Sequence, residues 1–87
     1  MAEYRLLIKS SAAKEIEAVD AKSEPQRILA RIWALAREPR AQGSETLAGH
    51  ADRYRVRQGK YRIIDLIDDH RTEVTIVKVG HRKDVYR

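Results

Sequence analysis

The residues best suited to chemistry in this sequence are arginines that alternate with apolar residues and lead into a turn. The stretch 53–62 reads Arg-Tyr-Arg-Val-Arg-Gln-Gly-Lys-Tyr-Arg, with five basic residues and no acidic one. A guanidinium binds phosphate through a planar pair of donors, and it also stacks on bases. This composition predicts a site for a polyanion, with a solvated basic strand face as the alternative.

The alternation predicts a β-hairpin that gathers these cations on one face. Gly59 and Lys60 suit a two-residue turn in which glycine comes first. That register places Arg57 opposite Arg62, and it puts Arg55 on the same face. Like charges directly opposite each other are destabilising, and a bound polyanion would relieve the repulsion.

The end of the chain supplies three more candidates, His81, Arg82 and Tyr86. Tyrosine can stack on a base or exchange a proton. With the arginines, such a set could cleave RNA without a metal, because the RNA's own 2′-hydroxyl would be the nucleophile. The protein would supply a proton acceptor, cations for the dianionic phosphorane and an acid for the leaving 5′-oxygen. Simpler alternatives are a C-terminal tyrosine packed on a sheet and a neutral surface histidine.

Other kinds of site have little support in the sequence. The histidines His50, His70 and His81 are scattered, there is no cysteine, and no glycine-rich phosphate loop precedes a helix. We therefore expect no metal site and no cofactor.

Length and composition favour one basic domain that spans residues 1–87. The chain carries a formal charge of +5 and has a pI near 9.8, which points to a nucleic acid or another anionic partner. The absence of cysteine makes a reducing cytoplasm the default. No apolar run approaches the roughly 20 residues that span a bilayer, and we see no secretory signal, so no membrane partner is expected.

Periodicity predicts the elements that position these residues. We expect a strand over 4–9, helices over 11–21 and 24–37, a loop over 38–52, strands over 53–57 and 61–67, and a last strand over 72–79. Ser10, Ser11 and Ser23 are candidate helix caps. Leu47 is expected to plug the core, and Val77 and Val79 to share one face of the last strand.

This order predicts an α+β fold, with two helices on one face of a mostly antiparallel sheet of about four strands, β-α-α-β-β-β. Arg55, Arg57 and Arg62 would then occupy the free face. The helices also carry Arg27, Arg31 and Arg37, which form either a solvated face or a contact with an acidic protein or with RNA.

Three stretches in order resemble the RelE/ParE toxin superfamily: Leu47-Ala48-Gly49, the segment from Tyr54 to Ile64, and the segment from Val79 to Arg87. The closing His-Arg-x-x-Val-Tyr resembles the RelE branch of ribosome-dependent mRNA interferases. The resemblance covers essentially the whole chain and implies a RelE-like fold. It also implies a type II toxin that binds the A site of the 70S ribosome, contacts mRNA and ribosomal RNA, and cleaves the mRNA codon exposed there.

The resemblance further implies a small RelB-like antitoxin that wraps the toxin and blocks its basic face. Carried over to this sequence, it makes Arg62, Arg82, Tyr86 and His81 the catalytic candidates. The expected substrate-binding residues are Arg53, Arg55, Arg57 and Lys60.

This chain departs from the family pattern because Arg55 and Arg57 stand where RelE enzymes often have lysines. An arginine holds its proton far more tightly than a lysine, so these two residues suit phosphate binding and not proton transfer. Proton transfer would then fall to Tyr86 or His81. Two alternatives stay open, a gyrase inhibitor of the same fold and a non-catalytic nucleic-acid-binding module.

Overall fold

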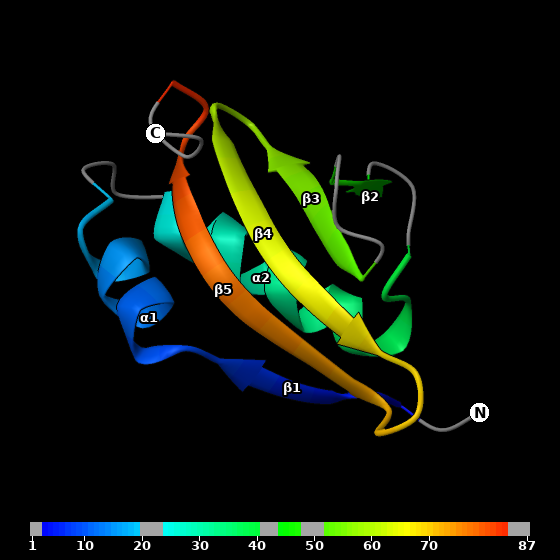
Figure 1. The fold of residues 1–87 in the computed structure, drawn as a ribbon. Coiled ribbons are helices and arrows are strands. Elements are labelled where there is room, and N and C mark those ends of the chain that lie inside the picture. Colours follow the sequence, from blue (N-terminus) through cyan, green and yellow to red (C-terminus); the bar gives the residue numbers. More distant parts are fainter. Residues whose placement is uncertain (1–2, 20–23, 41–43, 48–51, 84–87) are drawn as a thin grey trace.

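The computed structural model describes residues 3–19, 24–40, 44–47 and 52–83 (Figure 1). One strand is followed by two helices and then by four strands, in the order β1 (Arg5–Ile8), α1 (Ser10–Glu17), α2 (Glu24–Arg37), β2 (Ser44–Thr46), β3 (Arg53–Gln58), β4 (Tyr61–Asp68) and β5 (Glu73–His81). The predicted bounds of the second helix are confirmed. The first helix ends at Glu17, earlier than predicted, and Ser10 is its first residue while Lys9 is the N-cap. The cap predicted at Ser23 lies outside the described residues.

The strands form one mixed sheet in the order β1-β5-β4-β3-β2, in which β1 is parallel to β5 and the other pairs are antiparallel. The α+β class is confirmed, but the sheet has five strands within the described residues instead of about four. The additional strand, β2, falls in the segment 38–52 that was predicted as a loop. Three residues are too few to show a period-2 pattern, and β2 forms because the edge of β3 offers it hydrogen bonds.

Both helices bury their apolar stripes against the same face of the sheet. Ala12 and Ile16 from α1 join Ile28, Ile32 and Leu35 from α2 in one core cluster with the inward residues of β3, β4 and β5. Figure 1 shows α2 running behind the sheet, with the opposite face of the strands uncovered. Neither of the described helices therefore covers the face that was predicted to stay free.

A β-bulge corrects the predicted orientation of the last strand. The register of β4 against β5 shifts between Ile64 and Asp65, and Val77 is the β5 residue left without a partner there. One extra residue inverts the alternation beyond it. Val79 consequently joins Val74 in the core, while Val77 lines a groove on the open face.

Leu47 also differs from its predicted role, because it does not belong to the core cluster. It is half-buried and lines a groove of about 320 Å³ with Ile64 and Leu66. Its backbone N–H donates to the carbonyl of Arg53 at 2.8 Å. The pairing of β2 with β3 therefore places Leu47 on the open face.

Arg40, which follows α2, connects segments that are far apart in the sequence through side-chain hydrogen bonds. Its guanidinium donates to both carboxylate oxygens of Asp69 at 3.1 and 2.9 Å and to the hydroxyl of Tyr54 at 2.9 Å. The Tyr4 hydroxyl donates to the same carboxylate at 2.6 Å. The hydrogen bond from Arg40 is the main reason that the pKa of Asp69 lies below its usual value. This network joins the end of α2, β3, the β4–β5 turn and the residue before β1.

Candidate nucleic-acid interface

The basic hairpin adopts the predicted register. Arg57 pairs with Arg62, and Arg55 pairs with Ile64. Gly59 has a φ of 58° and Lys60 does not have a positive φ, as expected for a type II′ turn with glycine at its first central position. Local turn chemistry thus places the arginines side by side.

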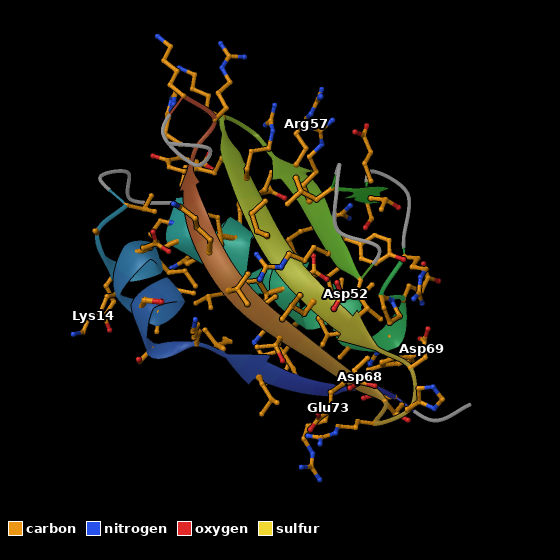
Figure 2. All side chains as sticks on the ribbon, viewed as in Figure 1. Lys14, Asp52, Arg57, Asp68, Asp69 and Glu73 are labelled. Atoms are coloured by element: carbon orange, nitrogen blue, oxygen red, sulfur yellow. The ribbon has the colours of Figure 1, made fainter. Side chains whose placement is uncertain are left out.

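Arg55, Arg57 and Arg62 converge on the open face of the sheet, where they line one small hollow. Figure 2 shows Arg57 projecting from the hairpin end of the strands, far from the β4–β5 turn where Asp68 and Asp69 lie. Both helices of the described chain lie on the other side of the strands (Figure 1). The result is a concentrated positive charge that can bind phosphate groups from solvent.

The fourth residue that lines this hollow is Glu45, which sequence reasoning missed. Glu45 pairs with Arg55 across the β2–β3 ladder. Its Oε2 accepts hydrogen bonds from Nε and Nη2 of Arg55, at 3.1 and 2.7 Å. These bonds, and then the charges of Arg55, Arg57 and Arg62, hold the pKa of the Glu45 carboxyl below its usual value. In the sequence Glu45 is one of three acidic residues in the segment 38–52 that was predicted as a loop, and nothing in the pattern indicated this pairing.

The remaining predicted cations lie around this cluster. Arg53 lines the neighbouring open-face groove with Lys9 and Lys78, so it extends the positive surface along β3. Lys60 is exposed in the hairpin turn. The backbone N–H of Arg82 donates to the carbonyl of Lys60 at 2.9 Å. That bond holds the residue after β5 beside the hairpin turn.

His81 lies on the other side of the sheet from the arginines. It pairs with Tyr61, whereas Arg62 pairs with Gly80, and directly paired residues share a face. The His81 and Tyr61 rings form a T-shaped pair, with 5.7 Å between ring centroids and 78° between planes. Its Nδ1 accepts a hydrogen bond from the Lys83 backbone at 3.2 Å. Within the described chain the structure therefore does not bring His81 together with the arginines.

Tyr86 lies outside the described residues, so its catalytic role stays a prediction. In the part of the chain that the structure describes, no three His, Asp or Glu side chains gather as they would around a metal ion. The same residues contain no helix that is long and apolar enough to cross a membrane.

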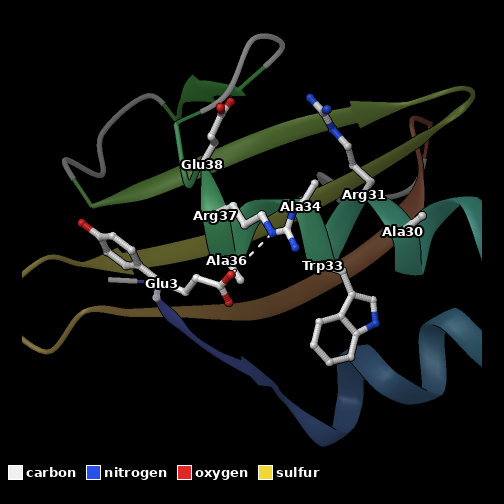
Figure 3. Close-up of a pocket in the computed structure, with 9 residues that line it drawn as sticks. Glu3, Ala30, Arg31, Trp33, Ala34, Ala36, Arg37 and Glu38 are labelled. Carbon is white, nitrogen blue, oxygen red and sulfur yellow. Dashed lines mark ion pairs between the residues drawn. The ribbon is translucent and has the colours of Figure 1, made fainter. Parts of the chain in front are cut away.

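A second surface lies on the outer side of α2 (Figure 3). A hollow of about 570 Å³ runs beside Trp33, with Arg31 and Arg37 on its rim. Trp33 is 66% exposed, and Nε of Arg37 is 3.5 Å from Oε1 of Glu3. An exposed tryptophan flanked by cations is typical of a surface that contacts a partner.

Comparison with known proteins supports this fold. Residues 6–86 match the family model described as the ParE toxin of the type II toxin–antitoxin system parDE. Toxin RelG of Mycobacterium tuberculosis is 40% identical over 68 residues, which cover 72% of this chain and 78% of RelG.

Solved structures with the same fold include two toxins in complexes. The archaeal RelE–RelB complex from Pyrococcus horikoshii matches with a TM-score of 0.81 and 26% identity, over 95% of this chain and 99% of that chain. The RelBE2 toxin–antitoxin complex of M. tuberculosis matches with a TM-score of 0.70 and 29% identity, over 93% and 100%. Because the family model spans nearly the entire sequence and the fold agrees throughout, the chain belongs to the RelE/ParE family and is a toxin of a type II toxin–antitoxin system.

Proposed function

We propose that this toxin is a metal-independent, ribosome-dependent endoribonuclease, an mRNA interferase that cleaves mRNA in the A site and so inhibits translation. The observation that carries the proposal is the convergence of Arg55, Arg57 and Arg62 on the uncovered face of the sheet. Guanidinium groups stabilise the dianionic phosphorane that forms when the 2′-hydroxyl attacks phosphorus. DNA lacks that hydroxyl and would not react.

We assign each of the candidate residues a role in this reaction. Arg62 and Arg82 stabilise the phosphorane, while Arg55 and Arg57 hold the backbone of mRNA or ribosomal RNA. Arg53 and Lys60 extend the contact along β3 and at the turn. Tyr86 stacks on a base or exchanges a proton. His81 faces away from the arginines, so its part as an acid would require a change in its position.

We also propose that a small RelB-like antitoxin binds this toxin in the cytoplasm. The solved relatives from P. horikoshii and M. tuberculosis are toxin–antitoxin complexes. The net charge of +5 favours an acidic partner, and the surface around Trp33 offers such a partner both an apolar anchor and cations.

The test maps 5′ ends on two copies of one mRNA after brief expression of the toxin. One copy is translated and the other lacks its start codon. We expect cuts only in the translated copy, with loss of the cuts in Arg62→Ala and Arg82→Ala. Arg71→Ala, a charge-matched control at the distant β4–β5 turn, should cut normally. Cuts in both copies would contradict ribosome dependence.

The second candidate is a gyrase inhibitor of the same fold. The family model that matches is described by ParE and parDE, which keeps this possibility open. An absence of cuts in both mRNA copies, accompanied by loss of DNA supercoiling, would favour it. If the toxin neither cuts RNA nor affects supercoiling but binds RNA, a non-catalytic binding module remains.

A further inference from the structure

Cleavage by the 2′-hydroxyl requires a group that accepts its proton, and arginines do not fill this role because they stay protonated at any physiological pH. Among the described residues that line the hollow between Arg55, Arg57 and Arg62, Glu45 is the one carboxylate. We propose that Glu45 is the general base that activates the 2′-hydroxyl of the RNA. This assignment rests on the proposed endoribonuclease function.

The local structure holds Glu45 in place for that task. The β2–β3 ladder sets it directly opposite Arg55, and two hydrogen bonds from Arg55 hold Oε2. The Glu45 side chain is 56% exposed and that of Arg55 is 41% exposed, so RNA can approach both from the open face. A base fixed by a neighbouring group needs little reorganisation when substrate arrives.

Electrostatics keep Glu45 in the form that accepts a proton. The surrounding guanidiniums lower the pKa of its carboxyl, with the hydrogen bond from Arg55 as the largest cause. Glu45 is therefore ionised at neutral pH. A lowered pKa weakens a base, but the same cations hold the phosphate and would bring the adjacent ribose hydroxyl to the carboxylate.

The reaction then balances without an additional reactant. Glu45 takes the proton of the 2′-hydroxyl while a bond forms between the 2′-oxygen and phosphorus. Arg62, with Arg82, stabilises the phosphorane while Arg57 holds the RNA backbone, and the bond between phosphorus and the 5′-oxygen breaks. Water or a tail residue protonates that oxygen. The products carry a 2′,3′-cyclic phosphate and a 5′-hydroxyl.

Two other roles for Glu45 lead to different results. If Glu45 only occupies the phosphate position as an internal competitor, its removal would strengthen RNA binding and preserve or raise cleavage. If the Glu45–Arg55 pair only joins β2 to β3, its removal would lower stability and weaken binding and cleavage together.

The test compares wild type with Glu45→Gln, Glu45→Asp and the control Glu17→Gln, an exposed carboxylate on α1. Cleavage of ribosome-bound mRNA gives kcat/KM. Binding is measured to programmed ribosomes whose mRNA has a 2′-O-methyl group at the cleavage position. Urea midpoints show whether each variant is folded.

We expect Glu45→Gln to lose about 10²–10⁴-fold in kcat/KM, with binding to the 2′-O-methyl mRNA unchanged or tighter. Glu45→Asp should recover part of the activity, and Glu17→Gln should match wild type. Cleavage by Glu45→Gln at the wild-type rate or faster would overturn the assignment of Glu45 as the general base and leave the proposed endoribonuclease function intact. Equal losses of binding and cleavage would overturn it in favour of a structural role. An inactive wild type would overturn the proposed function and this assignment together.

Discussion

Asp65 is a carboxylate buried in the core layer of a protein whose other described charges are mostly exposed. Its side chain is fully inaccessible in the central strand β4, and neither oxygen has a hydrogen-bond partner among the described residues. Burial without partners disfavours the charged form and raises the pKa of Asp65 to about 7. Between the two pKa values, the Asp65 carboxyl therefore keeps its proton in the folded protein. In the unfolded chain, where its pKa is the ordinary 3.8, it has already released that proton.

This proton makes stability fall as pH rises from about 4 to 7, because the folded pKa is above the unfolded one. At 1.36 kcal/mol per pKa unit the full effect is roughly 4 kcal/mol. Asp69 and Glu45 have lowered pKa values, so their stabilisation is lost only at more acidic pH, as they become protonated.

We expect Asp65→Asn to remove this dependence. Relative to wild type, its free energy of unfolding should rise by roughly 2–3 kcal/mol between pH 5 and pH 8. Urea titrations at both pH values measure the difference, with Asp52→Asn as an exposed control that should follow wild type. Parallel curves for Asp65→Asn and wild type would show that Asp65 does not titrate in this range.

At the scale of elements, the β3–β4 hairpin depends on one glycine. Gly59 has a φ of 58°, a conformation that costs an L-residue about 1–2 kcal/mol. A Cβ at this position would lie 3.5 Å from Oε2 of Glu24, in the first turn of α2. The turn that aligns Arg57 with Arg62 thus also lies against the start of the second helix.

Gly59→Ala should therefore lower the free energy of unfolding by about 1–2 kcal/mol through backbone strain. Lys60→Ala, at the adjacent exposed position without a positive φ, should leave stability within about 0.5 kcal/mol. Urea denaturation of both variants measures the contrast. Equal midpoints for Gly59→Ala and wild type would mean that the turn relaxes to a conformation that alanine accepts.

At the scale of the whole molecule, the fold separates two surfaces, a basic open sheet face and a helix-covered face. Binding of RNA to the open face should weaken steeply with salt, because each neutralised phosphate releases counterions. Arg57→Ala should reduce the slope of log K against log salt by about one.

Arg71→Ala removes the same charge at the far end of β4, where Arg71 lies near Asp68. Its slope should equal that of wild type. Fluorescence anisotropy with a short single-stranded RNA at several salt concentrations measures both variants. Equal reductions in the two slopes would indicate that net charge, and not the arginine cluster, governs binding.

Local patterns in the sequence were enough to predict the register of the basic hairpin and the bounds of the second helix. Alternation and a glycine-first turn were enough to pair Arg57 with Arg62 and to put Arg55 on the same face of the hairpin. Helical periodicity and Pro25 in the first turn defined α2. These predictions held because they depend on residues close together in the chain, for which the two-residue and 3.6-residue periods are reliable guides.

The tertiary structure decided what depends on contacts between distant segments. The bulge in β5 turned Val79 inward, and the cross-strand register separated His81 from Arg62. Pairing of the short strand β2 with β3 brought Glu45 among the arginines. A three-residue strand has no periodicity of its own and forms only against a neighbouring edge, so the carboxylate of the proposed site becomes visible only in the folded sheet.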